Sequence, residues 1–441
     1  MRAIKVFGVI CVLAGMAFLF WPRPAEDLIV IEQEEVVEPA PTVAAEPPTA
    51  DAVAAEEPRM ATPDEEFIME EPIIITETGD EELFHVVSLF FATNRALSAD
   101  APDPNDPTGQ FTSDDGPLRY GIAEVSIPEN HEVGALESQG FLEALFYEPD
   151  PEKHVILQRM DVFDVDIVLA EIQRQIDIGD DSTLFYIHGF NTSVETAARR
   201  AGQLTYDLNW NGPSFFFSWP SQENFLRYGV DKERARGSRT ELLEVFETVA
   251  ATETDQIVVI AHSMGTDLLA QTLELMEARD SAALAKIKTV ILAAPDINED
   301  NFRDDIVPAI DRIDDKYADF TVTVYASAGD TALNISEVTN SALRIGAMST
   351  LTDEQRAALA PVRMVDASQA ETNFFGHTYI NDNATVIEDV YCLLLKGPDP
   401  AKRASLEGLP DPDDGPAFRI RPKVPNVALD GDGPGGQYQC D

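Results

Sequence analysis

Residues 256–265 have the sequence QIVVIAHSMG. The first part is a short, continuous apolar run, which is typical of a strand buried on both faces of a parallel sheet. A helical pattern follows directly over residues 264–278. Ser263 stands between the two, with the small residues Ala261 and Gly265 on either side, as in the sharp strand-to-helix turn called a nucleophile elbow. Ala261 occupies a position where glycine is usual, but an ordinary helix-capping serine would not need small residues on both sides.

The same alternation of strands and helices runs through the chain from residue 183. Short apolar runs separated by helical patterns predict an α/β fold with a doubly wound, mostly parallel sheet. Functional residues are then expected in the loops that follow the strands, at the carboxyl edge of the sheet. Apolar runs occupy 183–187, 214–218, 256–261, 289–294, 321–326 and 362–365, and helical patterns occupy 194–208, 231–251, 264–278 and 386–395.

The loop after the run at 183–187 begins with HGFN, residues 188–191. The backbone N–H of Phe190, together with that of Met264 beside the serine, would form an oxyanion hole for the charge that develops on an attacked carbonyl. His188 precedes these amides along the chain. We interpret it as a packing and hydrogen-bonding residue rather than as a general base.

A serine nucleophile needs an acid and a base, and in this architecture both follow the serine along the chain. Of the six histidines, only His377 lies beyond the helix that follows the serine. Two carboxylates compete for the acid: Asp330 follows the run at 321–326, and Asp296 follows the run at 289–294. The order of the strands favours Asp330 and leaves Asp296 as the alternative. The acid would fix the tautomer of the histidine and stabilise its charged form, a chemistry that uses no metal and no cofactor.

Eight motifs stand out together: FFATNR at 90–95, VSIP at 125–128, IHGFN at 187–191, FSWPS at 217–221, AHSMG at 261–265, AAPD at 293–296, DTAL at 330–333 and GHTY at 376–379. With them the chain resembles a bacterial family of uncharacterised α/β-hydrolases, which are esterase- and lipase-like serine hydrolases. The resemblance covers about residues 85–396. It implies the α/β-hydrolase fold and ester hydrolysis, with Ser263 as nucleophile, Asp330 as acid and His377 as base, but it defines no natural substrate.

The ends of the chain differ from the region between them. Residues 1–25 carry three basic residues and an unbroken apolar run, which predicts a signal anchor or, if it is cleaved, a signal peptide. Residues 26–82 are rich in Pro, Ala and Glu and have a net charge of −18, so we expect a disordered linker. The predicted hydrolase domain spans 83–396, and a Pro/Gly-rich tail follows at 397–441.

The whole chain has 441 residues and a formal net charge of −48. Such acidity argues against a nucleic-acid binder, which needs clustered Lys and Arg. The expected partners are a small-molecule or lipid ester as substrate and a membrane contacted through the N-terminal segment. The expected location is the periplasmic side of a bacterial cell envelope, tethered to the inner membrane, or outside the cell if the signal is cleaved.

Cys392 and Cys440 are the cysteines outside the N-terminal apolar run. In an exported protein such a pair is more often a disulfide than two free thiols, and this pair would attach the tail to the domain. Two other functions stay open at this point. One is a non-catalytic envelope interaction module on a hydrolase fold, and the other is an amidase or peptidase with the same triad.

Overall fold

The computed structural model describes residues 84–99, 107–139, 147–330, 333, 343–347, 353–370, 383–408, 418–421 and 438–440. All of them lie in one of the two units of the chain, Glu57–Asp441. The predicted anchor at 1–25 and the predicted linker at 26–82 lie outside the described residues. Within the described residues, no helix has both the length and the apolar character that crossing a membrane requires.

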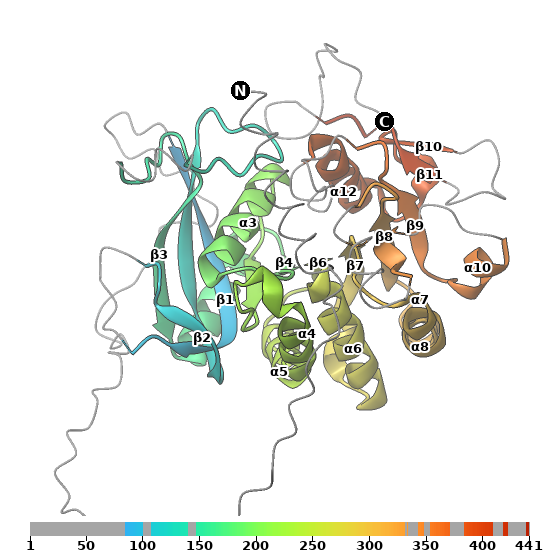
Figure 1. The fold of residues 1–441 in the computed structure, drawn as a ribbon, viewed down its shortest axis with the longest axis horizontal. Helices are drawn as coiled ribbons and strands as arrows, with labels where there is room; N and C mark the ends of the chain where they lie inside the picture. Colours follow the sequence, from blue (N-terminus) through green and yellow to red (C-terminus); the bar gives the residue numbers. More distant parts are fainter. Residues whose placement is uncertain are drawn as a thin grey trace, which may run out of the picture. The chain divides into compact units, whose positions relative to one another are not determined.

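Eleven strands of the described residues form one sheet (Figure 1). They are Phe84–Leu97 (β1), Phe111–Pro128 (β2), Ile156–Phe163 (β3), Ser182–Ile187 (β4), Ser214–Ser218 (β5), Gln256–His262 (β6), Ile287–Ala293 (β7), Thr321–Ala326 (β8), Arg363–Asp366 (β9), Leu406–Gly408 (β10) and Phe418–Ile420 (β11). Their order across the sheet is β10-β11-β9-β8-β7-β6-β4-β5-β1-β2-β3. In this order across the sheet, every neighbouring pair from β11 to β1 is parallel. The strands β2 and β3 at one edge and β10 at the other are antiparallel to their neighbours.

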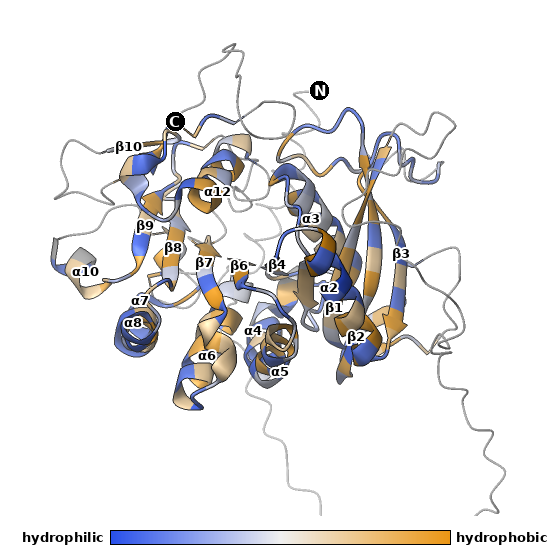
Figure 2. Ribbon diagram, turned by 180° about the vertical axis from the view of Figure 1, so that it is seen from behind, coloured by the Kyte–Doolittle hydropathy of each residue, from blue (hydrophilic) through white to orange (hydrophobic). Residues whose placement is uncertain are grey.

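Helices cover both faces of this sheet. In the described residues they are Val165–Ile178 (α2), Val194–Asp207 (α3), Tyr228–Gly237 (α4), Arg239–Ala250 (α5), Met264–Ala278 (α6), Glu299–Asn301 (α7), Val307–Lys316 (α8), Asp353–Ala358 (α10) and Ala384–Lys396 (α12). Short turns of other helix types lie at Phe225–Arg227 (η1), Ala282–Ala285 (η2), Phe302–Ile306 (η3, a π-helix), Ile345–Ala347 (η4) and Pro400–Lys402 (η5). One apolar layer includes α2, α5, α6 and α8, and a second layer on the opposite face includes α3 and α12 (Figure 1; α2 is labelled in Figure 2).

Successive strand residues supply these two layers in turn, because neighbouring side chains of a strand point to opposite faces. In β5, Phe215 and Phe217 join the layer of α5 and α6, whereas Phe216 joins the layer of α3. Phe185 of β4 stacks on Phe215 and contacts Phe246 of α5, with ring centroids 5.1 and 4.7 Å apart. The central strands are mainly hydrophobic and the surface helix α8 mainly hydrophilic in Figure 2. The run of three phenylalanines is therefore a strand buried on both faces.

The doubly wound, mostly parallel α/β sheet predicted from the sequence is confirmed. The helix α6 has the predicted bounds, and the strands β4 to β9 lie within two residues of the predicted runs. The helix predicted over 231–251 is wrong in one respect, since it consists of α4 and α5. The chain bends between them at Ser238, where ψ is near 2°. The Ser238 hydroxyl donates to the carbonyl of Arg234 at 2.9 Å and accepts from the Asn94 amide at 2.9 Å, which fixes the bend.

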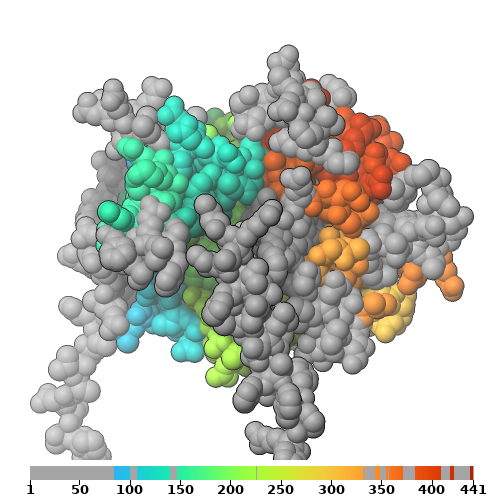
Figure 3. All heavy atoms as spheres, turned by 45° about the horizontal axis from the view of Figure 1, so that its top comes forward, coloured from blue at the N-terminus to red at the C-terminus, as the bar shows by residue number. Residues whose placement is uncertain are grey.

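Part of the predicted Pro/Gly-rich tail, 397–441, belongs to the main sheet. The strands β10 and β11 lie in this segment and extend the sheet beyond β9. Figure 3 shows the C-terminal elements, in orange to red, on one side of the displayed face. These two strands could not be predicted from the sequence, because strands of three residues are too short to show a hydrophobic period.

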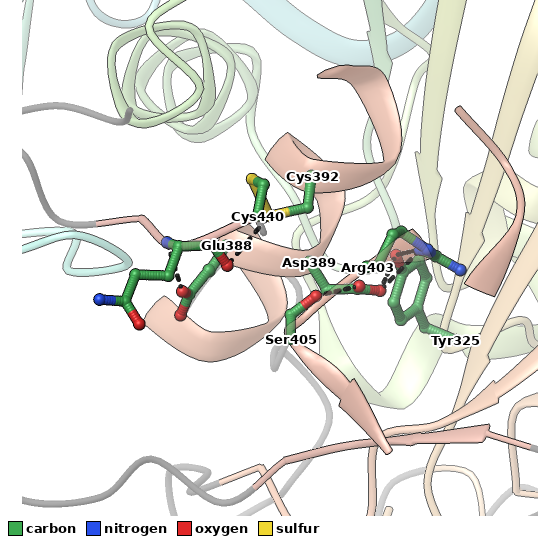
Figure 4. The surroundings of a disulfide bond; sticks show 8 residues. Tyr325, Glu388, Asp389, Cys392, Arg403, Ser405 and Cys440 are labelled. Carbon is green, nitrogen blue, oxygen red and sulfur yellow. Dashed lines mark hydrogen bonds and ion pairs between the residues drawn. A yellow bond between two sulfur atoms is a disulfide. The ribbon is translucent and has the colours of Figure 1, made fainter. Parts of the chain in front are cut away.

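Buried polar groups attach this C-terminal part to the domain (Figure 4). The Asp389 carboxylate of α12 accepts from Arg403 at 2.8 Å, from Ser405 at 2.5 Å and from the Tyr325 hydroxyl at 2.7 Å. Burial raises the pKa of Asp389, and the charge of Arg403 opposes that rise. Cys392 of α12 forms a disulfide with Cys440, 48 residues further along the chain. The last described residues are thus anchored to α12.

Candidate active site

Ser263 lies at the turn from β6 into α6, at the carboxyl edge of the sheet. Its φ is 53° and its ψ is −122°, a combination that residues other than glycine rarely adopt. Backbone bonds hold the turn: the Ser263 N–H donates to the carbonyl of Ala293 at 2.9 Å, and the Thr266 N–H donates to the carbonyl of Ser263 at 3.0 Å. A serine held in this conformation between a strand and a helix has the geometry of a nucleophile elbow.

The small residues around the serine have a steric reason. A Cβ on Gly265 would lie 2.4 Å from the carbonyl oxygen of His188, and a Cβ on Gly189 would lie 2.8 Å from the Cβ of Ser263. The loop after β4 and the start of α6 therefore approach each other more closely than side chains allow. Ala261 is fully buried among apolar residues of the core, where its methyl group has a place. This explains why the first small position accepts alanine.

His188 is part of the scaffold of this loop. Its Nδ1 lies 2.8 Å from the carbonyl oxygen of Gly189, which can only accept, so Nδ1 carries the proton. Its Nε2 then accepts from the Ser218 hydroxyl at 3.2 Å, and its ring stacks on Trp219 at 4.9 Å. Burial, with a smaller contribution from the charge of Arg95, lowers the pKa of His188 to about 3. A neutral ring with both nitrogens engaged fits the packing role expected from the sequence.

Both predicted oxyanion donors belong to the elements that meet at Ser263. Phe190 directly follows Gly189, and Met264 is the first residue of α6 and fully buried. The Phe190 ring packs edge to face against Tyr228, with ring centroids 5.5 Å apart. These two aromatic side chains come from the loop after β4 and from α4. Their contact joins the loop after β4 to the start of α4.

Asp296, the alternative acid, follows β7 and is bound by other groups. Its carboxylate forms a buried ion pair with Arg344, with Nε and Oδ1 3.2 Å apart, and accepts a hydrogen bond from the Tyr228 hydroxyl. Its backbone carbonyl accepts from the Lys232 ammonium at 3.4 Å. A carboxylate in a buried ion pair with a guanidinium has a structural task of its own, because removing one partner of such a pair is strongly destabilising.

Asp330, the favoured acid, follows β8 and is fully buried. Its Oδ1 accepts from the backbone N–H of Leu333 at 3.0 Å, and its own N–H donates to the carbonyl of Ser327 at 3.2 Å. Because β6, β7 and β8 are neighbours, Ser263, Asp296 and Asp330 all lie at one edge of the sheet. His377, the predicted base, lies outside the described residues.

Two buried charged residues near the loop after β4 were missed in the sequence. Arg95 lies in the second half of β1 and Asp231 in the first turn of α4, and neither side chain is exposed to solvent. The available signal was the place of Arg95 in the FFATNR motif, three residues after the end of an apolar run at Ala92. Asp231 carried no signal, since an acidic residue in the first turn of a helix is common.

Comparison with known proteins places the chain among hydrolases. The sequence model of a family described as "Alpha/beta hydrolase of unknown function (DUF900)" matches residues 168–394, just over half of the chain. A search of curated proteins finds no match. Among solved structures, an esterase from Pyrobaculum calidifontis is 12% identical over 53% of this chain and 94% of its own, with a TM-score of 0.30. A structure described as one of two fungal esterases from Rhizomucor miehei is 12% identical over 71% of this chain and 86% of its own, with a TM-score of 0.32.

Likenesses at these identities and TM-scores do not bear on the substrate. The family match covers β4 to β9 and the helices between them, which is the region that carries Ser263, Asp296 and Asp330. On this match, and with the sheet described above, the chain belongs to the family of alpha/beta hydrolases of unknown function, DUF900.

Proposed function

We propose that the chain is an exported serine hydrolase that cleaves carboxylic esters through an acyl-enzyme, with Ser263, His377 and Asp330 as its triad. In the first step His377 accepts the proton of the Ser263 hydroxyl while the oxygen attacks the acyl carbonyl. The backbone N–H groups of Phe190 and Met264 stabilise the oxyanion. Return of the proton to the leaving oxygen releases the alcohol and leaves the acyl group on the serine.

The second step regenerates the enzyme. A water molecule gives its proton to His377 and attacks the acyl-enzyme, and collapse of the second tetrahedral intermediate returns the proton to Ser263 and releases the acid. Asp330 stabilises the imidazolium formed in both steps. Asp296 is the weaker candidate for this role because Arg344 and Tyr228 already hold its carboxylate.

The observation that carries the proposal is the backbone conformation of Ser263. A positive φ at a serine costs free energy, of order 1–3 kcal/mol, and persists only where the surroundings enforce it. Here the positive φ is held by the backbone hydrogen bonds of the turn and by the close packing of Gly189 against Ser263 and of Gly265 against His188. The turn lies at the edge of the sheet where α/β proteins bind their ligands. An ordinary helix cap would need none of this.

Labelling with a fluorophosphonate tests the nucleophile. The wild type should be labelled, and Ser263→Ala should not be labelled at any reagent concentration that leaves other serines unmodified. Ser214→Ala is the matched control, since Ser214 is also buried and its hydroxyl has no hydrogen-bond partner among the described residues. A folded wild type that is not labelled, or Ser263→Ala labelled like the wild type, would overturn the proposal.

Export and a location at the cell envelope are part of the same proposal. The disulfide between Cys392 and Cys440 supports it, because disulfides persist mainly in oxidising compartments. Residues 1–25 would hold the enzyme at the membrane, facing a small-molecule or lipid ester. Fractionation of cells that produce the full chain, compared with a chain beginning at residue 26, tests this. Recovery of both chains in the same soluble cytoplasmic fraction would contradict it.

A further inference from the structure

The buried guanidinium of Arg95 binds the loop after β4 and the loop after β5. Its guanidinium donates to the Thr192 carbonyl at 2.7 Å, to the Ser218 hydroxyl at 3.0 Å and to the Ser221 carbonyl at 3.2 Å. The carboxylate that comes nearest to an ion pair with it is that of Glu223, 4.0 Å away and half exposed. Burial lowers the pKa of Arg95 to about 10, so it stays charged at neutral pH. Its interactions are therefore mainly with loop backbone and a hydroxyl.

Asp231 binds the same two loops. One carboxylate oxygen accepts from the Ser221 hydroxyl at 2.6 Å and from the Asn191 backbone N–H at 3.4 Å. The other oxygen accepts from the Gln222 backbone N–H at 2.8 Å. Asp231 is thus a buried carboxylate whose acceptors are satisfied by loop groups. Ser221 links Asp231 to Arg95, because its hydroxyl binds Asp231 and its carbonyl binds Arg95.

Arg95 and Asp231 both bind the loop that carries the proposed oxyanion donor. Asn191 has φ of 56°, and the Thr192 N–H donates to the Ser221 hydroxyl at 3.1 Å. The N–H of residue 191, and both the N–H and the carbonyl of residue 192, are therefore fixed by one network. Phe190 is the residue directly before this fixed stretch. Without these bonds the left-handed residue would relax toward commoner conformations and turn the neighbouring peptide.

We propose that Arg95 and Asp231 are positioning residues that preorganise the oxyanion-binding loop 188–192. The inference rests on the proposed function, because it assigns the loop a donor in ester hydrolysis. Electrostatic stabilisation of an oxyanion requires donors that are already in place when the charge develops. A displacement of about 1 Å at such a site costs on the order of 10²-fold in rate.

The test compares Arg95→Met with Arg403→Met. Arg403 is an equally buried arginine with a carboxylate partner, Asp389, and it lies in the C-terminal segment outside the proposed site. With a short p-nitrophenyl ester, Arg95→Met should lower kcat about 10²-fold and change KM by less than about threefold. Affinity for phenylboronic acid, which forms a tetrahedral adduct with the serine, should fall with kcat. Arg403→Met should lower the melting temperature and leave kcat unchanged.

The inference is overturned by a folded Arg95→Met enzyme with wild-type kcat, by an effect confined to KM, or by an equal loss of kcat in Arg403→Met. If Arg95→Met does not fold, Asp231→Asn takes its place, since it keeps the shape and removes an acceptor. It should lower kcat and phenylboronic acid affinity together, about tenfold, and unchanged values overturn the inference. A wild type without activity or labelling instead refutes the proposed function.

Discussion

Replacing Gly265 by alanine tests the geometry of the elbow. The new methyl group would lie 2.4 Å from the carbonyl oxygen of His188 and 2.9 Å from that of Ile187. Both contacts are backbone atoms at the end of β4, which is paired with β5 on one side and β6 on the other. Neither oxygen can move away like the end of a flexible side chain. The start of α6, which carries the serine, has to move instead.

The cost follows from this rigidity. Insertion of a methyl group into a tightly packed site costs about 1–3 kcal/mol, and backbone contacts at this distance place Gly265→Ala near the upper value. Against this, alanine gains about 0.5–1 kcal/mol over glycine inside a helix. A net loss of about 2 kcal/mol corresponds to a fall in Tm of about 4–8 °C for a domain of 150–250 residues, and to somewhat less for this longer one. Displacement of Ser263 should lower ester turnover about 10²-fold.

Thermal melting by circular dichroism and turnover of a p-nitrophenyl ester measure the two effects. The control is Gly229→Ala in α4, because a Cβ on Gly229 would have no atom within 4 Å. This change should leave the protein as stable as the wild type or stabilise it by up to about 1 kcal/mol. If Gly265→Ala melts and turns over like the wild type, the close approach between α6 and the end of β4 does not exist as described.

Three further predictions concern pH, the disulfide and the acid. Burial alone would lower the pKa of His131, but hydrogen bonds to two carboxylates outweigh it and raise that pKa to about 9. Its stabilising contribution is therefore complete below about pH 6.5 and is lost as pH rises through 9, so the gap in urea stability between wild type and His131→Gln should close at high pH; a constant gap refutes this. Replacement of Cys392 and Cys440 by serine should cost about 4 kcal/mol by loop-closure entropy across the 48-residue separation, and a Tm equal to that of the oxidised wild type contradicts it. Asp330→Asn should reduce ester turnover by about 10⁴, whereas Asp296→Asn should mainly destabilise the fold, by about 3–5 kcal/mol, since it removes one partner of the buried ion pair with Arg344; the opposite pattern assigns the acid to Asp296.

The sequence carried the central sheet clearly, because strands buried on both faces appear as continuous apolar runs. β4 to β8 have this property, and the apolar run at 183–187 already predicts β4. The antiparallel edge strands did not stand out in this way. β2 has 18 residues, and its first half, with exposed acidic residues at 114 and 115, lacks an apolar run. Local pattern therefore identified the buried centre of the sheet and left its edges undefined.

In the candidate site, too, local features could be predicted from the sequence and long-range contacts could not. Ser263 could be predicted because the elbow is a local structure, formed by residues within a few positions of each other. The partners of Asp296 could not be predicted, since Arg344 is 48 positions and Tyr228 is 68 positions away along the chain. In the sequence, Asp296 and Asp330 are two aspartates after two strands. Their difference lies in contacts between distant residues, which no local pattern contains.

Three motifs that are separate in the sequence lie together in the fold. β1 and β5 are parallel neighbours, with Thr93 opposite Ser218, and the Thr93 hydroxyl donates to the Ser218 carbonyl at 2.6 Å. This register brings Arg95, two residues further along β1, to the loop that follows β5, and its guanidinium reaches from there to Thr192. One hydrogen-bond network therefore includes residues of all three motifs, FFATNR, HGFN and FSWPS. A loop without ladder hydrogen bonds needs buried side chains to satisfy and fix its backbone, and the sheet register supplies them.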